Sequence, residues 1–215
     1  MQQIAIETPH GTARAHLLLT PGAPATAALV LGHGAGGGIA ARDLQAAAQA
    51  AAAEGLAVAL VEQPYRVAGR RAPPAAPRLD AAWLAVIERL RETELARMAL
   101  VVGGRSSGAR VACRTAVASG AIGVVCLAFP LKPPPRAGAT KPTSSRLPEL
   151  EAVSVPILVV QGTRDRFGIP PAGPGRTVVQ VAGDHGLKSD LAAVGAAVRG
   201  WLAELPGLTG LQSAT

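Results

Sequence analysis

The chain has 215 residues, of which 49% are hydrophobic and only 2% aromatic, and its formal net charge is +7. This length and composition exclude a disordered chain and predict one globular domain over residues 1–215. Nucleic-acid binding is not expected, because the arginines are spread along the chain and stacking aromatics are nearly absent. The core must therefore consist of Ala, Val, Leu and Ile, which is typical of parallel strands covered by helices on both faces.

Apolar runs alternate with helical patterns along the chain. Two strands at 4–7 and 15–20 are expected to pair antiparallel at the sheet edge. Further strands are expected at 27–32, 56–61, 98–103, 122–128, 155–161 and 177–181, and helices at about 41–54, at 79–94, from Ser107 onwards and at about 187–205. This order predicts an α/β fold with a mostly parallel sheet. No inserted block of helices is long enough for a cap domain, and residues 206–215 look like a flexible tail.

The N-terminus and the cysteines bear on location. The first residues lack the basic start and long apolar stretch of a signal peptide, and the Ala-rich run at 44–53 is too short to span a bilayer. Cys113 and Cys126 show no metal-ligand spacing and are expected to be buried hydrophobic residues. The sequence therefore predicts a soluble, cytoplasmic protein that makes no membrane contact.

A glycine-rich loop follows the predicted strand 27–32. It reads His33-Gly-Ala-Gly-Gly-Gly38, and its exposed backbone amides could hold an oxyanion. The same glycines also match the spacing of a dinucleotide-binding loop. That alternative is weaker, because the next strand ends in no clear acidic residue for a ribose apart from Glu62.

The most informative motif is Gly104-Arg-Ser-Ser-Gly108, which lies between an apolar strand and a predicted helix. A serine hydroxyl becomes a good nucleophile only when a base removes its proton, so a tight turn must present it to a histidine. Glycines on both sides permit such a strand-to-helix turn. Ser106 is therefore the candidate nucleophile.

Two later loops supply a candidate acid and a candidate base. Asp165 follows the predicted strand 155–161, and His185 follows the predicted strand 177–181. Asp184 and Glu62 are weaker candidates for the acid, because Asp184 adjoins His185 and Glu62 lies at an earlier strand end. The chain order of nucleophile, acid and histidine, each after its own strand, favours a Ser-His-Asp triad of Ser106, His185 and Asp165.

Long loops and arginines surround the predicted site. The stretches at 64–74 and 129–146 are rich in Pro and basic residues, and we expect them to form walls of a substrate channel at a shallow, open site. Four arginines also fall at predicted strand ends on this side: Arg66, Arg105, Arg164 and Arg166. One hypothesis is that they favour anionic esters or lactones. The other is that an arginine-rich chain simply places arginines everywhere.

These motifs together resemble the α/β-hydrolase superfamily, and within it the small dienelactone-hydrolase-like bacterial proteins related to the NSL-complex regulatory subunit. The motifs are HGAGGG at 33–38, PYRVAGRR at 64–71, GGRSSGAR at 103–110, AFPLKPP at 128–134, QGTRDRFG at 161–168 and GDHGLK at 183–188. The resemblance covers nearly the whole chain. It implies the triad named above, with the amide of Ser107 and one amide from the loop of Gly34, Ala35 and Gly36 as oxyanion donors.

The predicted function is hydrolysis of carboxylic ester, thioester or lactone bonds in a small molecule through an acyl-serine intermediate. No cofactor and no metal are expected. The alternative is a non-catalytic protein of this fold that acts as a binding module or complex subunit, because some relatives in the branch serve in larger assemblies. The sequence leaves the substrate and the oligomeric state open.

Overall fold

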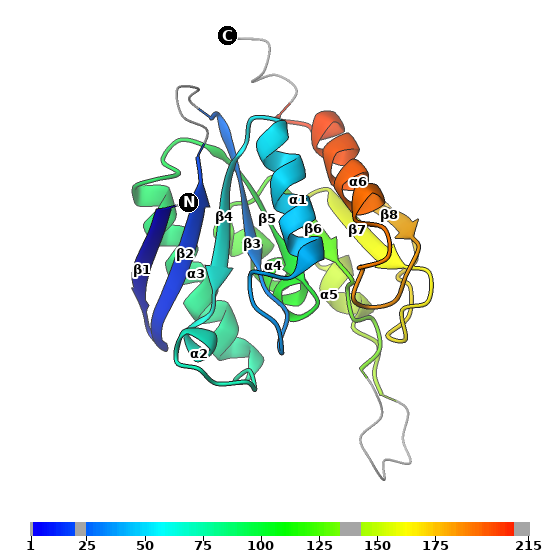
Figure 1. Ribbon diagram of the computed structural model, residues 1–215, viewed down its shortest axis with the longest axis horizontal. Helices are drawn as coiled ribbons and strands as arrows, with labels where there is room; N and C mark the ends of the chain where they lie inside the picture. The colour runs from blue at the N-terminus through cyan, green and yellow to red at the C-terminus, as the bar shows by residue number, and fades with distance from the viewer. Residues whose placement is uncertain (1, 20–24, 134–142, 209–215) are drawn as a thin grey trace.

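A computed structural model describes residues 2–19, 25–133 and 143–208 of the chain. Its centre is an eight-stranded sheet in the order β1-β2-β4-β3-β5-β6-β7-β8 (Figure 1). The strands are β1 (Gln2–Thr8), β2 (Gly11–Leu18), β3 (Ala27–Gly32), β4 (Ala57–Glu62), β5 (Ala99–Arg105), β6 (Gly123–Leu127), β7 (Ile157–Gly162) and β8 (Arg176–Val181). β2 runs antiparallel to both β1 and β4, whereas β3 to β8 run parallel. The predicted α/β architecture and its antiparallel edge are confirmed.

Helices cover both faces of the sheet, as the composition predicted (Figure 1). They are α1 (Arg42–Ala53), α2 (Pro64–Val67), α3 (Ala76–Glu92), α4 (Ser107–Ser119), α5 (Leu147–Glu151) and α6 (Leu191–Glu204). One core lies between the sheet and α3, α4 and α5, and the other lies between the sheet and the pair α1 and α6. In the described ranges no block of helices forms a cap over the strand ends, and no helix is long and apolar enough to cross a membrane.

The pair α1 and α6 packs closely because the residues between the two helices are small. A Cβ atom placed on Gly195 of α6 would lie 3.7 Å from the carbonyl oxygen of Ala46 and 3.8 Å from the Cβ of Ala50, both in α1. Below this contact, Leu44 of α1 and Val198 of α6 are fully buried against the sheet. The early and late parts of the chain thereby share one core (Figure 1).

Helix boundaries differ most from expectation at short or capped elements. α3 begins at Ala76 rather than at Leu79, because Pro77 is tolerated in the first turn of a helix. α6 begins at Leu191 rather than at 187, because Leu187 has a left-handed φ of 47° and Asp190 caps the helix. The loop at 64–74 contains α2, and the loop at 129–146 leads into α5; neither short helix was predicted from the periodicity of the sequence.

The predicted tail contains one packed residue near its start. Leu208 is buried at 3% exposure against the core beneath α1 and α6. Residues 209–215 of the tail, and 134–142 of the second long loop, lie outside the described residues.

Candidate active site

Ser106 occupies a strained turn between β5 and α4. Its φ of 52° and ψ of −105° fall in a region that side chains rarely adopt, and its N–H donates to the Leu127 carbonyl over 2.9 Å. The flanking glycines are required by space, because a Cβ on Gly104 or Gly108 would lie 2.5 or 2.4 Å from the carbonyl oxygen of Gly32. The turn can therefore form only because glycines let the backbones of β5 and α4 lie directly against the backbone of β3.

The three predicted triad residues are brought together. The Ser106 hydroxyl lies 2.9 Å from His185 Nε2, and His185 Nδ1 lies 2.8 Å from Asp165 Oδ2. The proton on Nδ1 donates to the carboxylate, which leaves Nε2 to accept from the serine. The Asp165 side chain is fully buried, while that of His185 is 20% exposed. This arrangement allows His185 to accept the proton of the Ser106 hydroxyl at a place that a substrate can reach from solvent.

The two weaker acid candidates lie elsewhere. Asp184 Oδ1 accepts the N–H of Gly186 over 2.8 Å at an exposed turn. Glu62 pairs with His16 at 2.9 Å and with Arg14 at 3.6 Å across the edge of the sheet. Neither carboxylate is the hydrogen-bond partner of His185.

Asp165 is held by neighbours from its own strand and loop. Gln161, which is fully buried at the end of β7, donates through Nε2 to Asp165 Oδ2 over 2.8 Å and to the Phe129 carbonyl over 3.1 Å. The N–H of Phe167 donates to the other carboxylate oxygen over 2.9 Å. The Phe167 ring also lies 4.3 Å from the His185 ring, between centroids. Sequence reasoning missed Gln161, although a glutamine inside an apolar strand is a usable signal.

Arg105 does not stand free at the mouth of the site. Its Nη2 donates to the His185 carbonyl over 2.8 Å, and its Nε donates to Asp43 Oδ2 over 2.8 Å. Asp43 is 1% exposed; its burial raises the pKa of the carboxyl, and the positive charge of Arg105 opposes that rise. Arg105 thus links the start of α1 to the histidine loop. We expected this arginine to contact substrate, but its guanidinium is instead bonded to groups within the protein.

The glycine-rich loop is anchored by two aromatic side chains. The Gln63 N–H donates to His33 Nε2 over 3.1 Å, so the ring proton sits on Nδ1 and donates to the Gly34 carbonyl over 2.8 Å. Burial lowers the pKa of His33, which keeps the ring neutral. The Tyr65 hydroxyl donates to the Ala35 carbonyl over 2.8 Å, and burial raises the pKa of Tyr65 to about 12. Both anchors therefore hold their hydrogen bonds at neutral pH.

Backbone amides flank the serine. Ser107 is the first residue of α4, so its N–H has no acceptor within the helix. On the other side, a Cβ on Gly34 would lie 3.7 Å from the Cβ of Ser106, which places Gly34 of the glycine-rich loop beside the serine. The positive end of the α4 dipole adds to the attraction for a negative charge at this point.

Comparison with known proteins agrees with this geometry. A family model described as alpha/beta hydrolase domain matches residues 25–189. The chain belongs to the α/β-hydrolase family. No curated protein matches this sequence.

Solved structures share the fold at low sequence identity. A lidless serine hydrolase from Xanthomonas campestris is 20% identical, with a TM-score of 0.72 over 96% of this chain and 95% of that one. Est1E from Butyrivibrio proteoclasticus, solved with ferulic acid bound, is 14% identical with a TM-score of 0.75 over 94% and 98%. A dienelactone hydrolase from Anabaena variabilis is 16% identical with a TM-score of 0.71 over 95% and 98%.

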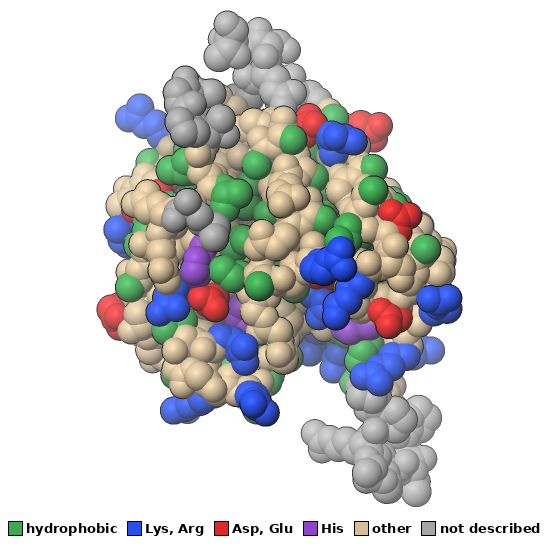
Figure 2. Space-filling model, viewed as in Figure 1, with side chains coloured by type: hydrophobic (Ala, Val, Ile, Leu, Met, Phe, Trp, Pro, Cys, Tyr) green, Lys and Arg blue, Asp and Glu red, His purple; other side chains and the backbone are tan. Residues whose placement is uncertain are grey.

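Cationic side chains surround His185. A cavity of about 330 Å³ is lined by Arg164, Arg166, Asp184, His185, Gly186 and Lys188. The Arg166 guanidinium also lies 5.0 Å from the centre of the Phe167 ring. Many of the Lys and Arg side chains in Figure 2 lie in the lower half of the view, toward which the parallel strands point in Figure 1. Sequence reasoning included Arg164 and Arg166 but missed Lys188.

Arg66 does not line this cavity. Its Nη1 donates to the Arg70 carbonyl over 3.3 Å, and its Nε is buried without a hydrogen-bond partner in the described part of the chain. The positive charge of Arg66 also contributes to the low pKa of His33. Arg66 is thus close to the glycine-rich loop rather than to the cavity at His185.

Proposed function

We propose that the protein is a serine hydrolase that cleaves carboxylic ester, thioester or lactone bonds. The observation that carries the proposal is the continuous chain of hydrogen bonds from the Ser106 hydroxyl through both ring nitrogens of His185 to the buried Asp165 carboxylate. A serine placed on a strained turn and bonded to a correctly oriented histidine is the arrangement that nucleophilic acyl transfer requires.

The proposed reaction has two stages. The Ser106 oxygen attacks the carbonyl carbon while His185 Nε2 accepts the hydroxyl proton and then gives it to the leaving oxygen or sulfur. Water next attacks the acyl-serine, with His185 again accepting a proton and returning it to Ser106. Asp165 keeps the ring in the productive tautomer and stabilises its positive charge.

Each tetrahedral intermediate carries a negative oxygen. We assign its stabilisation to the N–H of Ser107 together with an amide of the loop Gly34, Ala35 and Gly36. Support comes from the position of Ser107 at the start of α4 and from the close approach of Gly34 to Ser106. The hydrogen bonds from His33 and Tyr65 to this loop would keep its amides in place between turnovers.

We further propose that the hydrolase belongs to the small dienelactone-hydrolase-like branch and acts on small esters or lactones. The likeness to lidless serine hydrolases and to dienelactone hydrolase supports an open site of this kind, and the ferulic acid bound to Est1E shows that one neighbour of this fold accepts a small aromatic acid. Arg164, Arg166 and Lys188 beside His185 support a preference for an anionic substrate. Arg66, which lies near the glycine-rich loop and outside that cavity, is a further candidate contact for a longer substrate.

Labelling with a fluorophosphonate probe tests the nucleophile. Wild type and Ser106→Ala are compared in labelling and in turnover of p-nitrophenyl acetate. We expect the variant to lose labelling and to lose turnover by a factor of about 10⁴ or more. A folded wild type that behaves like the variant in both assays would contradict the proposal and would favour the binding-module alternative.

Substrate charge is tested with matched esters. We compare kcat/KM for p-nitrophenyl hemisuccinate, which is anionic, with that for p-nitrophenyl butyrate, which is neutral. Wild type should favour the anionic ester, and Arg166→Gln should reduce that preference by about tenfold, the equivalent of one charge-assisted hydrogen bond. Arg199→Gln on α6 is the control and should change nothing. A wild-type preference for the neutral ester would rule out the anionic class.

A further inference from the structure

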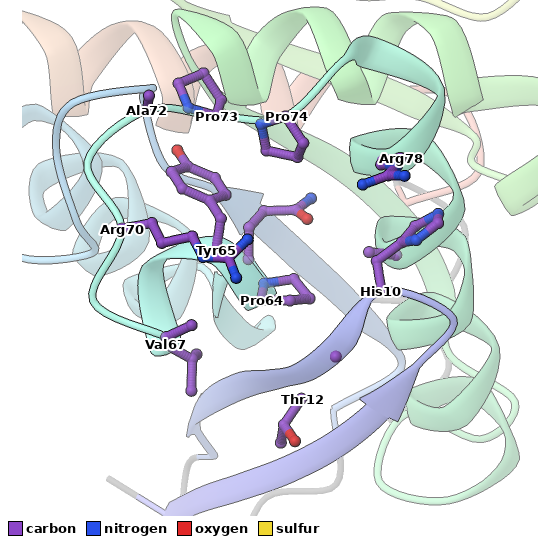
Figure 3. A pocket seen from close by; sticks show the side chains of 14 residues that line it. His10, Thr12, Pro64, Tyr65, Val67, Arg70, Ala72, Pro73, Pro74 and Arg78 are labelled. Atoms are coloured by element: carbon purple, nitrogen blue, oxygen red, sulfur yellow. The ribbon is translucent and has the colours of Figure 1, made fainter.

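A second cavity lies on the other side of the glycine-rich loop from His185. Its volume is about 490 Å³, and it is enclosed by the turn between β1 and β2, the loop that follows β4 and the first turns of α3 (Figure 3). None of the three triad residues lines it. A volume of this size holds a small organic molecule.

The floor of the cavity contains an unpaired acceptor. Gln63 lines the cavity and is 6% exposed. Its Nε2 donates to the Leu79 carbonyl over 3.2 Å, but its Oε1 is buried without a hydrogen-bond partner in the described part of the chain. A buried oxygen of this kind is costly unless a ligand or a water donates to it. Because Gln63 lines the cavity, a rotation of its amide would bring Oε1 to an N–H or O–H donor bound there.

The rim of the cavity is cationic. Arg70 lies on one side, with Arg78 and His10 together on the other (Figure 3). The lining includes no Asp or Glu, and within the described ranges neither arginine forms an ion pair. Unneutralised guanidinium groups at both sides of one opening favour a carboxylate.

The walls between floor and rim are largely apolar. The Tyr65 ring lies among Pro64, Pro73 and Pro74 in the middle of the view (Figure 3). Flat, rigid groups of this kind pack well against a ring or another planar body. The cavity thus has a hydrogen-bond acceptor at its floor, apolar walls and a positively charged rim.

We propose that this cavity binds a small organic anion with a planar apolar body. Its carboxylate would contact Arg70 or Arg78, and a hydroxyl or amino group at its other end would donate to Gln63 Oε1. The anion is either the charged part of the substrate itself or a separate ligand. In either case it would contact Tyr65 and Gln63, which hold the glycine-rich loop through Ala35 and His33.

Binding is measured by isothermal titration calorimetry with Ser106→Ala, so that the result does not depend on catalysis. Three probes differ by one group each: 4-hydroxybenzoate, benzoate without the donor, and 4-hydroxybenzamide without the charge. We expect 4-hydroxybenzoate to bind about tenfold more tightly than either of the others. Absence of binding by 4-hydroxybenzoate, or equal affinity for all three, would overturn the proposal.

Variants locate the bound probe. Arg78→Gln and Arg70→Gln, each combined with Ser106→Ala, should weaken 4-hydroxybenzoate by several-fold to tenfold and leave 4-hydroxybenzamide unchanged. Arg166→Gln and Arg199→Gln are the matched controls. A loss confined to Arg166→Gln would place the probe at His185 instead and would contradict the inference.

Kinetics of the wild type then distinguish the two sources. Competition between 4-hydroxybenzoate and p-nitrophenyl hemisuccinate would identify the anion as part of the substrate. A changed kcat without competition would identify a separate ligand that acts through the glycine-rich loop. Should the protein have no esterase activity, the calorimetric results still decide whether the cavity binds an anion.

Discussion

The serine and the histidine of the site are positioned by different kinds of interaction. Ser106 is placed by backbone contacts, because Gly104 and Gly108 allow β5 and α4 to touch the Gly32 carbonyl. His185 is placed by side chains, because Arg105 bonds its carbonyl and Asp165 bonds its ring. The serine side of the site therefore depends on glycines that have no side chain, whereas the histidine side depends on hydrogen bonds made by side chains.

The largest expected loss of stability comes from adding one methyl group where α4 contacts β3. In Gly108→Ala the new Cβ would lie 2.4 Å from the Gly32 carbonyl oxygen, so β3 and α4 must separate. We expect the free energy of unfolding to fall by about 4 kcal/mol or more, at the upper end for overpacking. Urea denaturation followed by circular dichroism measures this.

A second glycine provides the matched control. Gly200 lies within α6 and no atom lies within 4 Å of a Cβ built on it. Gly200→Ala should therefore raise the free energy of unfolding by about 0.5–1 kcal/mol through helix propensity. Equal effects of the two substitutions would mean that backbone contact does not place the serine.

Arg105→Gln tests whether side-chain hydrogen bonds position His185. The variant leaves Asp43 buried without its cation, which we expect to cost about 2–3 kcal/mol of folding stability at pH 7. Burial already raises the folded pKa of Asp43 above its unfolded value, and the loss of Arg105 would raise it further. A group with a raised folded pKa stabilises the folded state below its unfolded pKa, and this stabilisation is lost as the pH rises through the folded pKa. The deficit relative to wild type should therefore shrink toward acid pH.

Two further measurements separate charge from position. Asp43→Asn in the Arg105→Gln background should recover part of the stability at pH 7, because no buried charge remains. Activity should not recover with it, because the His185 carbonyl still lacks its donor. Full recovery of kcat in the double variant would show that Arg105 does not position the histidine loop.

The smallest effect concerns His33, where a side chain holds a backbone loop. His33→Phe removes the hydrogen bonds to Gly34 and Gln63 and should lower the free energy of unfolding by about 1–2 kcal/mol at pH 8. Since burial lowers the folded pKa of His33, the stability from its neutral form is present above the unfolded pKa and declines as pH falls toward the folded pKa.

Thermal unfolding of wild type and His33→Phe between pH 8 and pH 5 measures that decline. The wild type should lose the larger share of its stability on acidification, so that the two proteins converge. His10→Gln, at an exposed histidine, is the control and should follow the wild-type profile. Parallel profiles for His33→Phe and wild type would mean that His33 titrates normally.

The same contrast explains what could be predicted from the sequence. Buried strands and the glycines around Ser106 leave local patterns, and parallel strands bring their carboxyl ends to one edge. The sheet could therefore be predicted from these patterns, and so could the three residues that the structure brings into contact, Ser106, His185 and Asp165. Family membership and the parallel sheet agree with those predictions.

The supporting network left no such pattern. Arg105 meets Asp43 across a large separation in the chain, and no local rule pairs one of many arginines with one particular aspartate. Gln161 donates to the Asp165 carboxylate and to the Phe129 carbonyl, and Tyr65 donates to the Ala35 carbonyl, so each depends on partners that the sequence does not pair with it. The short helices α2 and α5 have too few residues for a periodicity to appear.

The packing of α1 against α6 has a kinetic consequence. Because these helices come from the early and late parts of the chain, the core on their side of the sheet requires contacts of large sequence separation. Such contacts cost loop-closure entropy before they contribute stability, and chains that depend on them fold slowly. The face of β7 and β8 that α6 covers would stay exposed to water until this last helix docks, and a refolding chain is most prone to aggregate during that interval.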